Sequence, residues 1–420
     1  MQKVLIIHTY YKLKGGEDSV VENEMELLRS NGLTVELLSF SNSGNTLLKL
    51  AQLPFNFSSY RQTKAKIASF KPDVVHIHNL HFSGSAAVVY AVKNTGTPLV
   101  MTLHNYRLLC PSGSLFHNNT LFMDSISPGF PWLAVKEGVY QNSSLITFWI
   151  SLSMYLHHKI GTWKRVDRFI SLGIHSKELF SDSALQPYAD RLVVKPNFCY
   201  PGPDAVSGAN KESTAETNDE KIAENNNENT AVNNNDNAVS PLHYLYVGRL
   251  TEEKGLKVLL AAFAENQLPL VIVGTGPLAD VVTVYTAKYK NITYKGEQKK
   301  KQIVELLDHA KALIFPSLWY ETFGMVVIEA FSRGIPVITS NHGNMKNLVT
   351  DQYNGLTFNV GSSEDLSKTV SEFEQMDHSK KNVFRQNART TYVSNYSPER
   401  NFQQLLDIYK AAISMKLYRR

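Results

Sequence analysis

Short apolar runs alternate with amphipathic segments along the first half of the chain. Residues 3–9 and 33–40 have the apolar content of buried strands, and residues 17–31 between them have helical periodicity. Gly32 follows that segment, where a helix C-terminus favours a residue that adopts a left-handed backbone. Further strands are predicted at residues 73–78, 98–104, 168–172 and 192–197. Because strands buried on both faces read as apolar runs, this pattern predicts a parallel sheet covered by helices.

The same alternation starts again at His243. Helices are predicted at residues 255–266, 277–290 and 300–311, with a further helix that begins near Phe323. Strands are predicted at residues 243–248, 268–274, 291–296, 312–316, 335–339 and 355–359. A last helical segment follows Ser397 and has Pro398 in its first turn. The pattern predicts an α/β fold with two Rossmann-like, doubly wound parallel-sheet domains that face a central cleft.

One segment between the two halves breaks this rhythm. Residues 202–240 contain almost no large apolar side chain and are dominated by Asn, Glu, Ala and Thr. Such a composition buries too little surface to offset the entropy of ordering, so a disordered insertion or linker is predicted. The expected organisation is a first domain at 1–200, the insertion at 201–240, a second domain at 241–396 and a terminal helix at 397–420 that crosses back to the first domain.

Composition and charge narrow the class of protein. The chain has 420 residues, an apolar share of 43%, a charged share of 19% and a net charge of +5. Because the positive charge is mild and dispersed, it favours anionic small molecules or an anionic membrane surface over a nucleic acid. The two cysteines, Cys110 and Cys199, make no disulfide framework, and the first residues do not resemble a signal peptide. We expect a reducing, cytoplasmic location.

The longest apolar run covers residues 145–156 and carries several Ser and Thr residues. It is shorter than the roughly 20 apolar residues that a spanning helix needs. Basic side chains follow it at Lys159, Lys164, Arg165 and Arg168. The favoured interpretation is a helix packed inside the first domain, and the alternative is a helix that lies on a membrane surface.

Loops that leave the carboxyl ends of parallel strands lead into helix N-termini, whose amides favour anions. The first such loop, residues 246–255, carries Gly248, Arg249 and Lys254. Two cations beside backbone amides suit a diphosphate, although solvated surface charges would give the same pattern.

The second such loop surrounds the predicted helix start at Phe323. Glu321 precedes it and Glu329 lies inside the helix. Carboxylates placed beside an anion-binding helix start suit the hydroxylated ends of a nucleotide sugar. The structural alternatives are a dipole partner for Glu321 and an exposed helix position for Glu329.

Weaker signals lie in the first half. Gly15 and Gly16 precede a helix and would let the backbone approach a ligand closely, although a tight turn also explains them. His76 and His78 lie in the predicted strand 73–78, His81 follows that strand, and His104 ends another. His76 and His78 share one strand face, as in some metal hydrolases, but no carboxylate cluster with ligand spacing accompanies them. Because His78 and His104 end their strands, polar contacts to the cleft are favoured over a metal site.

A pattern similar to a dinucleotide-binding fingerprint follows the predicted strand at residues 268–274. Gly274, Gly276 and Ala279 follow a predicted strand, and Glu297 lies about 20 residues further on. This pattern would indicate a nicotinamide-dependent oxidoreductase. However, it does not open a domain, and Pro277 removes an amide that a pyrophosphate would use.

Several of these segments together resemble glycosyltransferase family 4. The resemblance rests on "YVGRLTEEKG", "VIVGTGP", "ITYKGE", "ALIFPS" and "ETFGMVVIEAFSRGIPVI", and in the first half on "GGEDSVVENEMELLRSNG" and "VHIHNLH". It implies a GT-B fold and a retaining, metal-independent glycosyltransferase of the hexosyl type that uses no cofactor. The implied donor is a UDP- or GDP-linked sugar. The implied acceptor is a hydroxyl of a growing glycan or lipid-linked sugar, in surface polysaccharide biosynthesis at the cytoplasmic face of the inner membrane.

The resemblance also implies residue roles. Arg249 and Lys254, after Gly248, would hold the donor diphosphate, and Glu329 would bind the ribose. Glu321 and His104 would contact the transferred sugar, and the amides of Phe323, Gly324 and Met325 would assist Glu321. Gly15 and Gly16 would approach the phosphate. Residues 294–296, which include Lys295, would line the base. The first domain would bind the acceptor and the second the donor. The insertion departs from the family pattern. A nicotinamide-dependent oxidoreductase and a noncatalytic nucleotide-sugar binder remain the alternatives.

Overall fold

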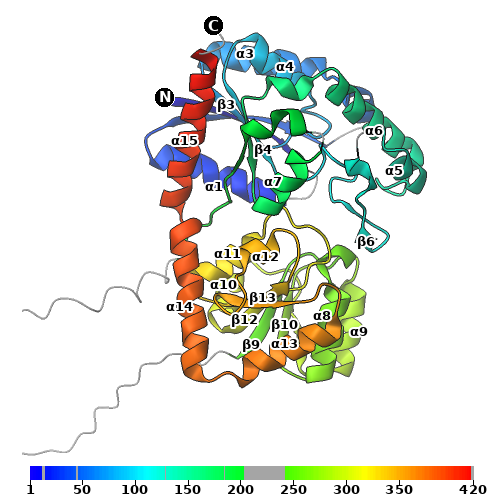
Figure 1. Ribbon diagram of the computed structural model, residues 1–420, viewed down its shortest axis with the longest axis vertical. Helices are drawn as coiled ribbons and strands as arrows, with labels where there is room; N and C mark the ends of the chain where they lie inside the picture. The colour runs from blue at the N-terminus through cyan, green and yellow to red at the C-terminus, as the bar shows by residue number, and fades with distance from the viewer. Residues whose placement is uncertain (12–14, 44–45, 128, 184, 203–241, 418–420) are drawn as a thin grey trace, which may run out of the picture.

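The structure is a computed structural model, and it describes residues 1–11, 15–43, 46–127, 129–183, 185–202 and 242–417 (Figure 1). The predicted disordered insertion falls almost entirely on residues 203–241 and lies outside the described residues. The described parts form two α/β domains, one above the other in Figure 1.

The first domain is built on a six-stranded parallel sheet in the order β2-β1-β3-β4-β7-β8. Its strands are β1 (Lys3–Tyr10), β2 (Thr34–Ser41), β3 (Val74–Ile77), β4 (Leu99–Leu103), β7 (Arg168–Ser171) and β8 (Leu192–Val194). Its helices are α1 (Gly16–Ser30), α2 (Thr46–Gln52), α3 (Phe57–Phe70), α4 (Ala87–Asn94), α5 (Trp132–Glu137), α6 (Ser144–Lys159) and α7 (Ile174–Ser181). A short hairpin, β5 (Phe116–His117) and β6 (Thr120–Leu121), was not predicted. All the predicted strands of this half are present.

The second domain repeats the arrangement with the strand order β11-β10-β9-β12-β13-β14. Its strands are β9 (His243–Val247), β10 (Leu270–Val273), β11 (Ile292–Tyr294), β12 (Ala310–Phe315), β13 (Val337–Ser340) and β14 (Gly355–Phe358). Its helices are α8 (Leu256–Asn266), α9 (Ala279–Lys288), α10 (Lys300–Asp308), α11 (Met325–Ser332), α12 (Met345–Leu348), α13 (Ser363–Gln375) and α14 (His378–Asn395). The strand order reverses between β9 and β12, and ligands of open parallel sheets bind at such a switch point.

The predicted helix over residues 300–311 was too long. Helix α10 ends at Asp308, and β12 already begins at Ala310. Ala310 is fully buried and pairs with His243 of β9, and the ammonium of Lys311 lies 2.5 Å from the Glu374 carboxylate. Sheet pairing and this ion pair place Lys311 in a strand, which the local pattern did not show.

The terminal helix α15 (Pro398–Leu417) joins the two domains. Helices α14 and α15 run end to end along one side of the molecule, beside the second and the first domain respectively (Figure 1). The apolar side chains of Leu405 and Tyr409 are fully buried in a cluster with Val4, Ile6 and Val74 of the first sheet. Burial of that face fixes α15 on the first domain.

Helix α6 packs with an unusual polarity. Polar side chains of α6 that include Thr147, Ser151 and His157 are buried against the domain, whereas Leu145 and Leu156 are 79% and 46% exposed. The helix is therefore packed on the first domain, as the favoured interpretation required. Among the helices in the described ranges, none has the length and apolar content needed to cross a membrane.

Candidate active site

A cleft of about 910 Å³ opens between the two domains, where the loops after the parallel strands face one another. From the first domain it is lined by the glycine pair of the β1–α1 loop and by His104 after β4. From the second domain it is lined by the loop after β9 and the start of α11. The predicted site residues that line it are Gly15, Gly16, His104, Gly248, Arg249, Lys254, Glu321, Phe323, Gly324 and Met325. The fold thus brings ten predicted residues into one cavity.

The glycine pair leaves open space at the first-domain wall. A methyl group placed on Gly15 or Gly16 would meet no atom within 4 Å. Asp18 holds this helix start, since its carboxylate accepts hydrogen bonds from the Gly15 amide at 2.9 Å and from His8 Nε2 at 2.8 Å. The backbone is therefore fixed in a position that a ligand can approach closely.

Glu17, beside the glycine pair, also lines the cleft. Its carboxylate accepts a hydrogen bond from Asn79 Nδ2 at 2.8 Å. Burial and the neighbouring Asp18 charge raise the pKa of Glu17 to about 8, although Arg107 and Asn79 oppose the shift. Sequence reasoning missed Glu17, because its only local signal was its place after two glycines.

Lys254 and Glu321 form the centre of the second-domain wall. Lys254 Nζ lies 2.6 Å from Glu321 Oε1, and the Ser317 hydroxyl donates to the same oxygen at 2.7 Å. The ammonium also lies 5.2 Å from the centre of the Trp319 ring. Glu321 is buried, with only 6% of its surface exposed, so both partners are held in a defined geometry.

Arg249 occupies the outer part of the same wall. Its side chain is 64% exposed, and its guanidinium lies 3.0 Å from Glu253 Oε1. An exposed pair of this kind contributes little to stability, so Arg249 is free to turn toward a stronger anionic partner. Both predicted cations, Arg249 and Lys254, therefore line the cleft, and each faces a carboxylate.

The start of the helix predicted near Phe323 lies at the wall of the cleft. Helix α11 begins at Met325 after the N-cap Gly324, two residues later than predicted. The amides of the first turn of a helix have no partner within the helix, and Gly324, Met325 and Val326 all line the cleft. This arrangement can bind an anion.

Two predicted site residues lie outside the lining of the cleft. Glu329 is half-buried on α11, and burial raises the pKa of its carboxyl, with Lys300 opposing the shift. Lys295 is exposed after β11. Their roles toward the ribose and the base remain predictions.

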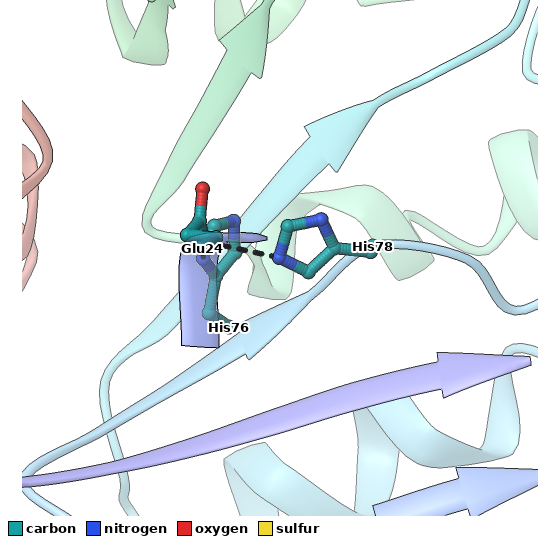
Figure 2. Close-up of side chains that lie close together, drawn as sticks. All are labelled: Glu24, His76 and His78. Carbon is teal, nitrogen blue, oxygen red and sulfur yellow. Dashed lines mark hydrogen bonds and ion pairs between the residues drawn. The ribbon is translucent and has the colours of Figure 1, made fainter. Parts of the chain in front are cut away.

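A buried cluster of charged and polar groups lies behind His104. His104 Nε2 lies 2.9 Å from His78 Nδ1, and His78 Nε2 lies 3.1 Å from Glu24 Oε1. His76 Nδ1 lies 2.9 Å from the same carboxylate oxygen. Figure 2 shows Glu24 close to both His76 and His78. The sequence showed no carboxylate cluster beside the histidines, but the fold brings the carboxylate of Glu24 to both of them. His78, which was expected to contact the cleft, does not line it. Glu24 is distant in sequence, and only the packing of α1 on the sheet places it there.

This cluster already contains its own cation. Lys195 Nζ lies 3.2 Å from Glu24 Oε2. His76 Nε2 lies 2.7 Å from the Thr102 hydroxyl, so the ring is engaged on both nitrogens. Glu24, His76 and His78 have the donor types and closeness of a metal site, but the Lys195 ammonium neutralises the carboxylate, and we assign no metal. His81 is buried and lines a cavity of about 110 Å³ together with His78 and His104.

The dinucleotide-like glycines have a packing role. A methyl group on Gly274, which has φ +140°, would lie 1.8 Å from the carbonyl oxygen of Gly248. A methyl group on Gly276 would lie 2.5 Å from the Leu250 carbonyl oxygen. Neither glycine lines the cleft. These residues are small because the loop after β9 packs against them, which removes the main support for a nicotinamide site.

Direct contacts join the two domains beside the cleft. The Thr322 hydroxyl donates to the His104 carbonyl oxygen at 2.9 Å. The Ser176 amide donates to Asn344 Oδ1 at 3.2 Å. His104 and Glu321 are thereby held on opposite sides of one cavity.

Two family models match the sequence. The model described as glycosyl transferases group 1 matches residues 227–391, and the model described as glycosyltransferase family 4 matches residues 14–133. Together they cover more than half of the chain. The O-antigen chain mannosyltransferase C of Escherichia coli is 24% identical over 177 residues, which is 41% of this chain and 47% of that protein. The chain spans less than half the length of the curated relatives it matches.

Solved structures share the fold over nearly the whole chain. A glycosyltransferase from Rickettsia africae matches with a TM-score of 0.67 and 16% identity, over 98% of this chain and 99% of that one. HepE of Anabaena, in complex with UDP, matches with a TM-score of 0.62 and 15% identity, over 98% of this chain and 100% of that one. With its two facing parallel-sheet domains and its two matching family models, this chain belongs to glycosyltransferase family 4 and has the GT-B fold.

Proposed function

We propose that the protein is a retaining glycosyltransferase. It moves a hexosyl group from a UDP- or GDP-linked sugar to a hydroxyl of a growing glycan or lipid-linked acceptor. The observation that carries this proposal is the Lys254–Glu321 pair, at 2.6 Å, beside the open start of α11 in a cleft that also contains Gly16 and His104. Cations, amides and a carboxylate within one cavity suit a donor with an anionic middle and hydroxylated ends.

The difficult step of this reaction is departure of the nucleotide diphosphate. The bond between the anomeric carbon and the phosphate oxygen breaks, so negative charge grows on the leaving group. Lys254, Arg249 and the first amides of α11 would stabilise that charge, as preorganised donors do in other active sites. The proposal needs no metal and no cofactor for this stabilisation.

Retention of configuration requires that the acceptor hydroxyl attack the face from which the phosphate departs. The new bond joins the anomeric carbon to the acceptor oxygen, and the departing phosphate oxygen takes the acceptor proton. We assign no protein nucleophile. Glu321 would accept hydrogen bonds from hydroxyls of the transferred sugar, and His104 would contact that sugar from the first domain.

Similar proteins support the class of substrate. HepE is a structural neighbour that has been solved with UDP and with UDP-glucose. The similar protein from Escherichia coli is an O-antigen chain mannosyltransferase. We therefore place the reaction in surface polysaccharide biosynthesis, with a nucleotide sugar as donor.

We further propose that the first domain contacts a membrane surface through α5 and α6. Exposed apolar side chains lie on these helices or directly after α6, among them Trp132 at 65%, Leu145 at 79% and Ile160 at 60%. Lys136, Lys159 and Lys164 are exposed on or beside the same helices. An apolar face with lysines around it matches an anionic bilayer surface. This contact would hold the enzyme at the cytoplasmic face of the inner membrane, near lipid-linked acceptors.

A ligand panel tests the proposed function. Thermal unfolding of the full chain would be recorded with UDP, GDP, UDP-glucose, GDP-mannose and NAD. We expect UDP or GDP species to raise Tm and NAD to leave it unchanged, because only a ligand that binds the native state stabilises it. A shift with NAD alone would favour the oxidoreductase. Binding of a nucleotide sugar without transfer or hydrolysis would favour a noncatalytic binder.

A further inference from the structure

We propose that Glu24 and His78 are positioning residues, which orient His104 so that its Nδ1 lone pair is free to accept a hydrogen bond from a sugar hydroxyl in the cleft. This inference rests on the proposed function, because it assigns a hydrogen-bonding role within the same site. Glu24 and His78 lie behind His104 and do not line the cleft.

The three side chains form a continuous hydrogen-bonded chain. Glu24 Oε1 lies 3.1 Å from His78 Nε2, and His78 Nδ1 lies 2.9 Å from His104 Nε2. The planes of the His78 and His104 rings are inclined by only 23°, and their centres lie 5.2 Å apart, as suits a hydrogen bond between the ring edges. No more than 9% of any of the three residues is exposed, so the chain is shielded from water.

The order of the donors follows from the carboxylate. An ionised carboxylate only accepts hydrogen bonds, so His78 must carry its proton on Nε2. A neutral imidazole has one N–H group, and His78 Nδ1 is then an acceptor. His104 must therefore carry its proton on Nε2, and its Nδ1 is left as an acceptor. Among the described residues, none hydrogen-bonds to His104 Nδ1.

The charges around the chain support these protonation states. Burial alone would raise the pKa of Glu24, but Lys195, His76 and His78 together hold it well below its ordinary value. Burial and the neighbouring His76 lower the pKa of His78 to about 4, against the pull of Glu24. Burial and His78 lower the pKa of His104 well below its ordinary value. Both rings are thus neutral at pH 7.

The other groups that face the chain hold Glu24 in place. Lys195 Nζ lies 3.2 Å from Glu24 Oε2, and His76 Nδ1 lies 2.9 Å from Oε1. The Tyr409 hydroxyl of α15 lies 2.8 Å from His76 Nδ1. His8 of β1 further lowers the pKa of both His78 and His104 through its electrostatic interaction with each ring. The arrangement uses the chemistry by which a carboxylate orients a histidine in other active sites, with a second imidazole between them.

A direct test is the protonation pattern of the two rings. The full chain would be labelled with ¹⁵N-histidine, and His78 and His104 would be assigned from spectra of single His→Gln variants. We expect both rings to show a proton on Nε2 and none on Nδ1 from pH 6 to pH 8. A proton on His104 Nδ1, a charged His104 at pH 7, or a stoichiometric bound metal in the purified protein would overturn the proposal. This measurement needs no substrate, so it stands apart from the proposed function.

A matched pair of variants tests the consequence. In His78→Asn the amide oxygen replaces Nδ1 as the acceptor for His104, whereas His78→Leu removes the acceptor. The readout is kcat/KM for release of nucleotide diphosphate from UDP-glucose or GDP-mannose, whichever the wild type cleaves. We expect a loss of at least about tenfold for His78→Leu and of less than about threefold for His78→Asn, since one hydrogen bond distinguishes them. Equal losses in both variants would overturn the positioning role. If the wild type binds neither of the two nucleotide sugars and neither UDP nor GDP, the proposed function fails. The protonation pattern of the two rings would still show whether Glu24 and His78 orient His104.

Discussion

Lys254 Nζ lies 2.6 Å from Glu321 Oε1, and this ion pair joins the loop after β9 to the loop before α11. The two residues are far apart in the sequence and were assigned to different parts of one ligand. Their opposite charges neutralise each other across this contact. A bound diphosphate would therefore share the Lys254 ammonium with Glu321, which places the transferred sugar next to the leaving group.

Lys254→Ala should weaken binding of UDP or GDP and lower kcat/KM by about a hundredfold or more, because it removes a cation from the leaving group. It should also destabilise the fold by roughly 1–3 kcal/mol, since Glu321 stays buried without its partner. Calorimetric titration and thermal unfolding would measure these effects. Lys257→Ala is the control, because Lys257 is 58% exposed and pairs with Glu252 outside the cleft. Equal nucleotide affinity in Lys254→Ala and wild type would remove Lys254 from the site.

Glu321→Gln should keep nucleotide affinity within a few fold and reduce transfer strongly, because the amide is a poorer acceptor for sugar hydroxyls. The double variant Lys254→Ala/Glu321→Gln should recover much of the stability that Lys254→Ala loses and none of its activity. Steady-state kinetics and Tm would separate the two effects. Transfer at the wild-type rate in Glu321→Gln would contradict the assigned role.

Glu17→Gln should change how stability depends on pH. The pKa of Glu17 is raised to about 8 in the folded protein, so the native state binds this proton more tightly than the unfolded state. That contribution is present at acidic pH and is lost as pH rises through about 8, by at most about 1.4 kcal/mol per pH unit. Wild-type Tm should thus fall relative to Glu17→Gln between pH 5 and pH 9. Glu26→Gln, an exposed position on the same helix, is the control, and parallel curves for wild type and Glu17→Gln would refute the prediction.

Two glycine variants separate packing from ligand binding. Gly274→Ala should destabilise the protein by about 2 kcal/mol or more, because its backbone has φ +140° and the added methyl group would lie 1.8 Å from a carbonyl oxygen. Gly16→Ala should keep its stability, because no atom lies within 4 Å of the new methyl group, but should bind nucleotide sugars more weakly. Denaturant unfolding and nucleotide titration measure both. If Gly274→Ala is stable but selectively loses NAD binding, the nicotinamide-dependent oxidoreductase would be favoured again.

Removal of exposed apolar side chains from α6 should weaken membrane binding. Leu145→Ser/Ile160→Ser should lower binding to phosphatidylglycerol vesicles by about tenfold or more, because each buried aliphatic side chain contributes roughly 1.5–3 kcal/mol. Vesicle co-sedimentation measures it, and added salt should weaken the wild-type binding. Val284→Ser is the control, since this side chain is 67% exposed in the second domain. Wild-type binding by the double variant would exclude this face as the contact.

The sequence alone determined the two sheets and the location of the cleft. The continuous apolar runs indicated strands that are buried on both faces of a sheet. The carboxyl ends of parallel strands lie at one edge of that sheet. Gly248, Lys254, Glu321 and Gly324 could therefore be placed together from loops that were each identified locally. All four residues line the cleft.

Tertiary structure alone decided how the side chains within and behind that cleft interact. Glu24 meets His76 and His78, Lys254 meets Glu321, and Gly274 meets the loop after β9 only because distant segments pack together. The raised pKa of Glu17 likewise depends on desolvation by other elements. Distances and burial between remote segments are properties of the folded chain, and no local pattern of apolar and polar residues encodes them.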